Sequence, residues 1–253
     1  MAKIRKQYVC TNCGHIESKW VGRCPSCNEW NTLEETQSVS SNNSHTSRNN
    51  LTTQRKSASA SHLANIETGG NNRYRTGISE FDRVMGGGLI QDSLTILSSP
   101  PGCGKSSLAL MIAAHLTEQG YTAIYATGEE SASQIRRRAD RILSHIDENL
   151  WILADTSMDN VLRHIESIDA DFIVIDSIQT FSMDAIDSRP GSPTQTMQCA
   201  TELLYTAKNP ARPRAVMMIG QMTKENELAG LRSLEHMVDT VLLMDSNVGE
   251  EVR

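Results

Sequence analysis

The stretch Leu94-Thr95-Ile96-Leu97-Ser98-Ser99-Pro100-Pro101-Gly102-Cys103-Gly104-Lys105-Ser106-Ser107 decides the fold of most of this chain. The apolar run 94–97 predicts a buried strand, and a turn rich in proline and glycine leads from it into a helical pattern that begins at Lys105. This order is typical of a phosphate-binding loop, because the free N–H groups of the turn and the positive end of the helix attract phosphate oxygens. We therefore predict that a nucleotide binds to the loop residues Ser99, Pro100, Pro101, Gly102, Cys103, Gly104, Lys105, Ser106 and Ser107.

Two side chains of the loop carry its expected chemistry. Lys105 should reach the β and γ phosphates of ATP, and the Ser106 hydroxyl should ligate Mg²⁺. One position departs from the usual motif, because Ser99 stands five residues before Gly104, where the first glycine is expected. A small residue can still serve there, with a tighter turn. The alternative is a glycine-rich turn that holds no nucleotide.

Short apolar runs alternate with helical patterns from residue 76 onward. The runs are 94–97, 122–126, 150–153, 172–175, 215–219 and 240–244. Between them, residues 105–119 and 196–207 repeat apolar side chains at the helical period. Apolar strands that alternate with helices predict an α/β fold with a mostly parallel, buried sheet covered on both faces. Ligands of such sheets bind at the carboxyl ends of the strands.

One of these runs closes on a carboxylate. Asp171-Phe172-Ile173-Val174-Ile175-Asp176-Ser177 has the pattern of a Walker B strand. We expect Asp176 to hold Mg²⁺ through water beside Ser106, since a hard cation that already carries phosphate oxygens needs a further carboxylate. Asp171, which precedes the strand, is expected to be a solvated cap.

Thr127-Gly128-Glu129-Glu130-Ser131 follows the run 122–126 and therefore also lies at a carboxyl end. One glutamate there can orient the water that attacks the γ phosphate. We favour Glu129 as the catalytic residue, because Ser131 has the character of a helix N-cap and Glu130 fits the first turn of that helix. The alternative makes both glutamates caps.

The same helical pattern carries Arg136, Arg137, Arg138 and Arg141. An arginine run of this kind usually forms a solvated face. The alternatives are a subunit interface or a contact with DNA.

Four cysteines near the N-terminus form two pairs, Cys10-x2-Cys13 and Cys24-x2-Cys27. This spacing can place four thiolates around one tetrahedral Zn²⁺. Because all four positions would then be filled by protein, the zinc is expected to be structural and not catalytic. The alternatives are four unrelated core cysteines or two disulfides.

The composition divides the chain into three parts. Residues 1–34 are expected to form a zinc-binding domain that is too small to fold on apolar burial alone. Residues 35–75, rich in Ser and Asn, are expected to be a flexible linker, and residues 76–253 to form the α/β domain. Residues 1–75 hold 10 Lys and Arg against 5 Asp and Glu, whereas residues 76–253 hold 14 against 25. The acidic second part excludes phosphate binding over its whole surface, so any nucleic-acid site must be local.

The first residues, Met-Ala-Lys-Ile-Arg-Lys, lead into the cysteine pairs without an apolar segment, and no stretch approaches membrane-spanning length. We therefore expect no signal peptide, no membrane contact and a cytoplasmic location.

Three further stretches are informative together. They are Tyr8-Val9-Cys10 with Lys19-Trp20-x-Gly22-Arg23-Cys24-Pro25-x-Cys27-x-x-Trp30-Asn31-Thr32-Leu33, then Gly86-Gly87-Gly88-Leu89, and Leu234-Glu235-His236-Met237-Val238-Asp239-Thr240-Val241. With the phosphate loop, they resemble the RadA/Sms family of bacterial ATPases of DNA recombination and repair. The resemblance covers nearly the whole chain outside the linker, although the glycine run alone would also suit KaiC-like ATPases.

The resemblance implies a RecA-like P-loop core that assembles as a homo-hexameric ring, binds single-stranded DNA in its channel and drives branch migration with ATP. By position, it gives motor roles to Lys105, Ser106, Glu129 and Asp176. Family members continue beyond the position of Arg253 into a Lys-Asn-Arg-Phe-Gly motif and a Lon-protease-like domain. The resemblance therefore implies a C-terminally truncated form, in which hydrolysis is weak or depends on partners.

Two more segments receive roles from the resemblance. Lys224, in Gln221-Met222-Thr223-Lys224-Glu225, matches a segment that senses the γ phosphate or reaches a neighbour's site, the alternative being an ordinary surface lysine. The stretch from Phe181 to Gln195, which contains Arg189, matches a channel loop that contacts DNA, and the alternative is a plain solvent loop.

Two classes of function remain open. The first is a DNA-dependent ATPase of recombinational repair that acts on single-stranded or branched DNA. The second is a zinc-anchored module that recruits a recombinase or a replicative helicase and uses the nucleotide as a switch. Trp20 and Trp30 suit a contact with protein or DNA, unless they cover the metal core.

Overall fold

The computed structural model describes residues 4–10, 16–17, 19–25, 30–31, 33–39, 62–65, 73–221 and 232–245. The chain divides into two compact units, Met1–Ile66 and Glu67–Arg253. In the described part of the chain, no helix has the length and apolar character that crossing a membrane requires.

The first unit is built on a small antiparallel sheet. β1 (Ile4–Cys10) lies in the middle and pairs with β2 (Ile16–Glu17) and along its whole length with β3 (Leu33–Val39). Its described core consists of buried Cys24 and Leu33, with Tyr8 packed against them. A short 3-10 turn, η1 (Leu63–Asn65), follows later in this unit.

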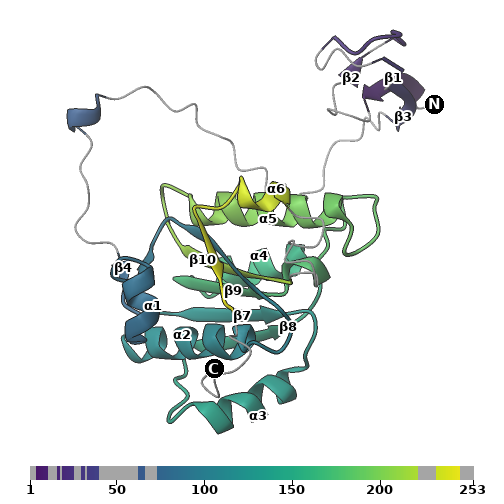
Figure 1. The fold of residues 1–253 in the computed structure, drawn as a ribbon. Helices are drawn as coiled ribbons and strands as arrows, with labels where there is room; N and C mark the ends of the chain where they lie inside the picture. The colour runs from purple at the N-terminus through teal and green to yellow at the C-terminus, as the bar shows by residue number, and fades with distance from the viewer. Residues whose placement is uncertain are drawn as a thin grey trace. The chain divides into compact units, whose positions relative to one another are not determined.

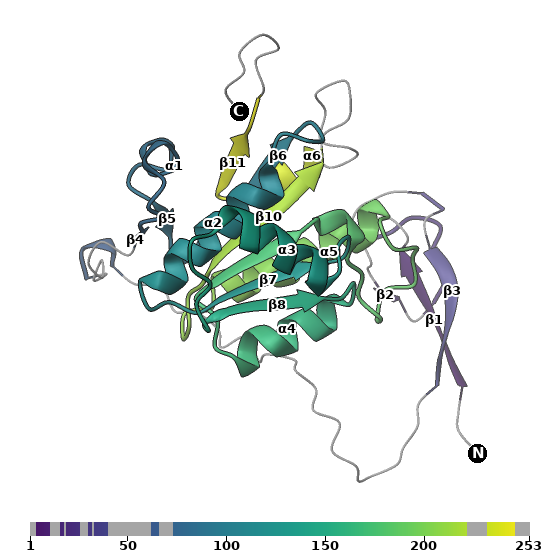
Figure 2. The same ribbon diagram turned by 90° about the horizontal axis from the view of Figure 1, so that it is seen from below.

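The second unit is built on a six-stranded parallel sheet with the order β11-β6-β10-β9-β7-β8 (Figures 1 and 2). Its strands are β6 (Leu94–Ser99), β7 (Ala123–Thr127), β8 (Leu150–Ala154), β9 (Phe172–Asp176), β10 (Ala215–Gln221) and β11 (Thr240–Leu243). The six apolar runs in the sequence are thus confirmed as strands of one parallel sheet. A separate two-stranded pair, β4 (Arg73–Tyr74) and β5 (Leu89–Ile90), precedes it.

Helices cover both faces of this sheet (Figure 1). Against one face pack α1 (Ser79–Val84), α2 (Lys105–Glu118) and α3 (Ala132–Ile142). Against the other pack α4 (Met158–Ser167), the 3-10 turn η2 (Ile178–Thr180), α5 (Pro193–Ala207) and α6 (Arg232–Glu235). Side chains of β9 alternate between the two cores, with Phe172 and Val174 on the α2 side and Ile173 and Ile175 on the α5 side. This alternation explains why the central strands are apolar throughout.

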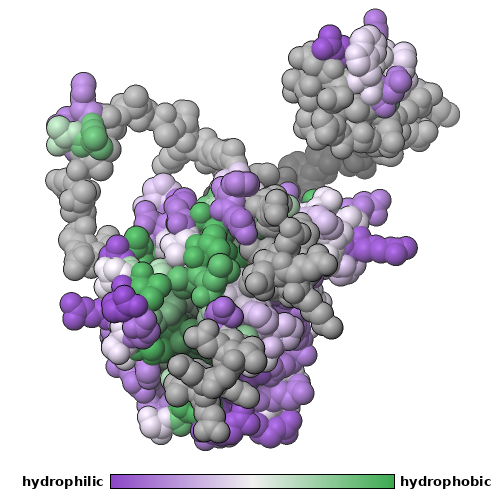
Figure 3. Space-filling view, in the orientation of Figure 1, coloured by the Kyte–Doolittle hydropathy of each residue, from purple (hydrophilic) through white to green (hydrophobic). Residues whose placement is uncertain are grey.

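The two outer strands differ from the prediction that all six runs are buried. β8 and β11 lie at the edges of the sheet, where Trp151 is 49%, Val241 39% and Leu243 64% exposed. On the face of the second unit that Figure 3 shows, hydrophobic residues gather in one area. The apolar pattern indicates a strand. It does not show whether the strand lies at the edge or in the centre of the sheet, because that depends on the strand order.

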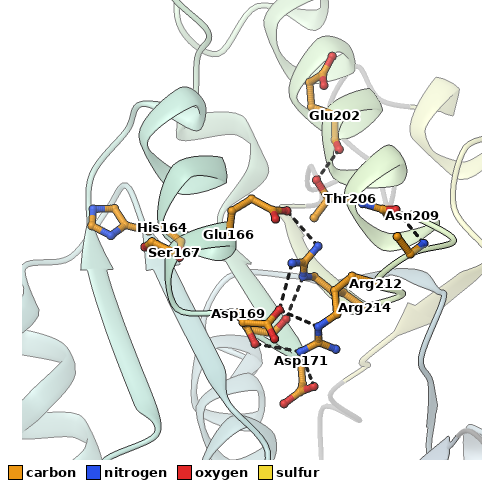
Figure 4. A network of polar contacts seen from close by, with 12 residues as sticks. His164, Glu166, Ser167, Asp169, Asp171, Glu202, Thr206, Asn209, Arg212 and Arg214 are labelled. Atoms are coloured by element: carbon orange, nitrogen blue, oxygen red, sulfur yellow. Dashed lines mark hydrogen bonds and ion pairs between the residues drawn. The ribbon is translucent and has the colours of Figure 1, made fainter. Parts of the chain in front are cut away.

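An arginine network ties together the amino ends of neighbouring strands (Figure 4). Arg214, only 1% exposed, lies 3.0 Å from Glu166 and donates to the Ala170 carbonyl at 3.1 Å. Arg212 donates to Asp171 Oδ1 at 2.8 Å, and Asp171 Oδ2 accepts the Thr122 N–H at 2.8 Å. The expectation that Asp171 is a solvated cap is therefore wrong: its carboxylate joins the start of β7 to the segment that leads into β10.

Candidate nucleotide site

The phosphate loop joins β6 to α2 at the carboxyl end of the sheet. Gly102 has φ 84° and Gly104, the N-cap residue of α2, has φ 92°. Side chains with a Cβ rarely adopt these angles, so the loop needs glycine at both positions. The N-terminus of α2 opens directly at Lys105, as the sequence predicts, and carries the positive end of the helix dipole.

The side chain of Lys105 is 8% exposed and turns toward its own loop. Its ammonium donates to the Ser99 carbonyl at 2.9 Å, to Ser99 Oγ at 3.0 Å and to the Pro100 carbonyl at 3.2 Å. Burial lowers the pKa of Lys105, while nearby negative groups, among them Asp176 and Glu129, act in the opposite sense. Ser99, the departure from the usual glycine, is thus a hydrogen-bond partner of the lysine.

Asp176 ends β9 next to the loop and is 6% exposed. Its carboxylate accepts hydrogen bonds from the Tyr125 hydroxyl and from the Ser106 side chain. Burial nevertheless raises the pKa of Asp176, because these hydrogen bonds offset only part of the loss of water around the charge. The same burial, with the neighbouring carboxylate, strongly raises the pKa of Tyr125. Ser106 and Asp176 therefore lie together, as a shared Mg²⁺ site requires.

Glu129 follows β7 and is held from two neighbouring strands. Ser177, directly after β9, donates to Glu129 Oε1 at 2.5 Å, and Gln221, the last residue of β10, donates to the same oxygen at 2.9 Å. Gly128 brings the chain close to η2, since a Cβ there would lie 2.2 Å from Thr180 Oγ1. These contacts fix the glutamate at the carboxyl ends of β7, β9 and β10.

Glu130 has different hydrogen-bond and ion-pair partners from those of Glu129. Ser131 is the N-cap of α3, in a capping box with Gln134, which confirms that prediction. The helix begins at Ala132, so Glu130 precedes the cap and the expectation that it belongs to the first turn is wrong. Its carboxylate instead pairs with Arg138.

The arginine run does not behave as one solvated face. Arg136, Arg137 and Arg141 are exposed, and Arg136 pairs with Asp140 within the helix. Arg138 is only 17% exposed in its pair with Glu130 and also acts electrostatically on Asp176 and Tyr125. The solvated-face reading is therefore wrong for Arg138, because the helix turns this one guanidinium inward.

The loop that the resemblance connects with DNA has a defined backbone. Gln195, which is 2% exposed, donates to the carbonyls of Met183, Ile186 and Ser188 at 3.2, 2.9 and 3.2 Å and accepts the Met183 N–H at 2.9 Å. Arg189 is exposed on this loop. One buried amide thus organises the segment that presents Arg189.

Several predicted site residues fall outside the described part of the chain. Lys224 does so, and of the four cysteines Cys13 and Cys27 do as well. Cys10 ends β1, and Cys24 is fully buried. A buried cysteine beside the sheet is compatible with a zinc ligand, and the four-cysteine set remains a prediction.

The fold also brings to the site four residues to which the sequence assigns no role in nucleotide binding. They are Tyr125, Arg138, Ser177 and Gln221. The sequence does carry a sign of Tyr125. Apart from Thr122 at its start, the run 122–126 is apolar, so the hydroxyl of Tyr125 stands out as a polar group within a buried strand. In the sequence, Gln221 is distinguished only as the first residue of the segment around Lys224. Both strand-end residues, Ser177 and Gln221, follow from the rule that parallel strands end at one edge.

The donor set fits a magnesium nucleotide. A helix N-terminus and an ammonium suit phosphate oxygens, while a hydroxyl next to a buried carboxylate suits a hard cation that keeps part of its water. The second carboxylate, Glu129, lies close enough to act on Lys105 electrostatically. The arrangement is that of a site for a nucleoside triphosphate with a candidate base beside it.

Comparison with known proteins agrees with this geometry. The model of the AAA domain family matches residues 63–227, and the model of the rubredoxin metal binding domain matches residues 8–35. The chain is 38% identical over 247 residues to the DNA repair protein RadA of Bacillus subtilis, a match that covers 97% of this chain and 53% of that protein. For the proteins of the same name from Mycolicibacterium smegmatis and Campylobacter jejuni, the identities are 39% over 257 residues and 36% over 253. These matches cover 100% of this chain and 54% and 55% of the relatives.

The chain therefore spans about half the length of the curated relatives it matches. The AAA domain model covers most of the second unit, including the phosphate loop, Glu129 and Asp176. On these grounds the chain belongs to the AAA domain family, and along nearly its whole length it is similar to proteins named DNA repair protein RadA.

Proposed function

We propose that this chain is an ATP hydrolase of DNA repair that binds ATP with Mg²⁺ at the phosphate loop. The observation that carries the proposal is the placement of Glu129, which Ser177 and Gln221 hold beside Lys105 and Asp176. Two neutral hydrogen-bond donors fix the orientation of this glutamate, as the positioning of an attacking water requires.

Each side chain then has a distinct task. Lys105 exchanges its loop acceptors for β and γ phosphate oxygens, and Ser106 and Asp176 hold the cation. Mg²⁺, when bound, would neutralise charge on the phosphates. Glu129 orients water toward the γ phosphate, and Lys224 is proposed to sense that phosphate or to reach a neighbouring subunit's site.

For the first unit we propose a structural Zn²⁺ held by Cys10, Cys13, Cys24 and Cys27. The rubredoxin metal binding model over residues 8–35 and the complete burial of Cys24 support this assignment. Zinc would supply stability that a unit of this size cannot easily gain from apolar burial alone.

The nucleic-acid part of the function is proposed from the relatives, which are named DNA repair proteins. We propose that the chain binds single-stranded or branched DNA, with Arg189 as one contact, and acts in branch migration as part of a homo-hexamer. The exposed position of Arg189 on a loop organised by Gln195 supports a contact at this point.

A second candidate is a nucleotide-switched module that recruits a recombinase or a replicative helicase without motor activity. The exposed tryptophans of the first unit favour it, because they offer a surface to a partner.

ATP turnover with and without single-stranded DNA distinguishes the two. We expect turnover that rises with DNA and is lost in Lys105→Ala. Nucleotide binding without DNA-stimulated turnover would favour the recruiting module, and native mass measurement with ATP would show whether the chain forms a ring.

A further inference from the structure

Two tryptophans stand exposed on the first unit. Trp20 is 57% and Trp30 is 67% exposed, whereas the described core of the unit consists of Cys24, Leu33 and Tyr8. The tryptophans therefore do not take part in that core. Leaving two indoles in water costs free energy in proportion to their apolar area, and a unit this small has little apolar area to spare.

The two rings flank the same point of the backbone. A Cβ placed on Gly22 would lie 3.7 Å from Trp20 Cη2 and 3.7 Å from Trp30 Cζ3. The Asn31 N–H donates to the Gly22 carbonyl at 2.9 Å, and Arg23 and Trp30 face each other in an antiparallel bridge. Both indoles thus approach the place where a Gly22 side chain would start, with their six-membered rings toward it.

The surroundings of the rings are basic. Lys19 and Arg23 are exposed next to the tryptophans, and the Arg23 guanidinium lies 5.7 Å from the centroid of the Trp30 ring. Residues 1–66, the whole first unit, hold 8 Lys and Arg against 4 Asp and Glu. This charge is opposite to that of residues 76–253 and favours a polyanion as the occupant.

We propose that Trp20 and Trp30 form a stacking platform for single-stranded DNA, with Lys19 and Arg23 on its phosphates. Proteins bind single strands by combining cationic side chains with aromatic faces on which unpaired bases stack. In a duplex the faces of the bases are stacked on one another and are not accessible to the indoles. A duplex could therefore offer this platform only its phosphates. The proposal goes beyond ATP hydrolysis, since the platform and the phosphate loop belong to different units.

Tryptophan fluorescence tests the stacking directly. The chain has three tryptophans, so Trp151→Phe leaves Trp20 and Trp30 as the only indoles. An oligo(dT) strand should quench this fluorescence. A strand of equal length that carries abasic sites has the same phosphate charge but no bases, and it should quench far less. Equal quenching by both strands would overturn the proposal, because charge alone would then explain the binding.

Affinity measurements on the full chain supply the second test. Trp20→Ala with Trp30→Ala should weaken oligo(dT) binding at fixed salt by at least about 5-fold per ring. Trp20→Phe with Trp30→Phe keeps two aromatic faces and should retain most of the affinity, which separates stacking from loss of folding. Trp151→Ala is the matched control, because it removes a tryptophan of similar exposure from the second unit.

Two outcomes would contradict the proposal: unchanged affinity in the double alanine variant, or tighter binding of an oligo(rU) strand than of oligo(dT). Lys105→Ala separates the two proposals, because it should abolish turnover and leave the quenching intact. If oligo(dT) does not quench the fluorescence of the Trp151→Phe chain while DNA still stimulates its ATP turnover, the platform proposal is wrong and the ATPase proposal is unaffected.

Discussion

The Lys105 ammonium lies 3.0 Å from the Ser99 hydroxyl, so the residue that stands in place of the usual first glycine of the loop is a partner of the phosphate-binding lysine. The two backbone acceptors, at Ser99 and Pro100, hold the same ammonium. A nucleotide must therefore compete with three oxygens of the loop for this lysine.

Ser99→Ala should remove one of those acceptors. We expect the free chain to lose about 1–2 kcal/mol of stability, since a hydrogen bond to a charged group is lost. ATP should bind more tightly, because the Lys105 ammonium then gives up fewer hydrogen bonds within the loop when it binds the phosphates. Thermal unfolding with and without ATP measures both effects. Weaker ATP binding would show that the Ser99 hydroxyl contacts the nucleotide instead.

Glu129→Gln should lower the rate of ATP hydrolysis by at least about 100-fold while ATP binding persists, because the amide keeps the shape of the side chain but cannot act as a base. Glu130→Gln is the control, since Glu130 faces Arg138. Single-turnover hydrolysis beside equilibrium nucleotide binding separates the two residues. A larger loss in the Glu130 variant would reverse the assignment.

Asp176→Asn should raise the thermal stability of the free chain, by about 2 °C or more for a domain of this size. Burial raises the pKa of Asp176 above its unfolded value, so its contribution to stability is most favourable below about pH 3.9 and is lost as the pH rises through the folded pKa. Asparagine is neutral throughout. The gain should therefore be present at pH 7 and shrink toward pH 4, which unfolding curves across this range would measure.

The same variant should lose Mg²⁺-dependent turnover, because an amide is a poor ligand for this cation. A melting temperature below that of the parent at pH 7 would argue that the hydrogen bonds from Tyr125 and Ser106 outweigh the burial of the charge.

Gly128→Ala should destabilise the second unit by about 1–3 kcal/mol through overpacking. The new methyl group would lie 2.2 Å from Thr180 Oγ1 and 2.7 Å from Thr180 Cβ. Denaturant unfolding measures the loss, and turnover should fall as well because Glu129 is the next residue. Adding Thr180→Gly to Gly128→Ala should restore part of the stability; no recovery would mean that the crowding lies elsewhere.

Much of the second unit could be predicted from the sequence because its signals are local. An apolar run buried on both faces, glycines at two positive φ angles and Ser131 before a helix each act within a few residues. Lys105, Ser106 and Asp176 were found in the same way, since each occupies a fixed place relative to a strand end.

The remaining features depend on which strands are neighbours. Ser177 and Gln221 meet at Glu129 because β9 and β10 are adjacent and end at one edge, although Gln221 is 92 positions from Glu129 in the chain. Asp171 pairs with Arg212 for the same reason, at the opposite ends of the strands. No local pattern carries this information.

The parallel α/β core, the phosphate loop and the residue types at the strand ends follow from the amino-acid sequence alone, because strand, turn and helix signals arise from the backbone preferences of successive residues. Three features follow only from the folded chain: Ser99 holds Lys105, Arg138 turns inward to Glu130, and Trp20 and Trp30 lie outside the described core of their unit. Each of these features depends on how a side chain packs against other segments of the chain. The sequence gives the chemistry of a side chain, whereas packing determines the direction in which it points.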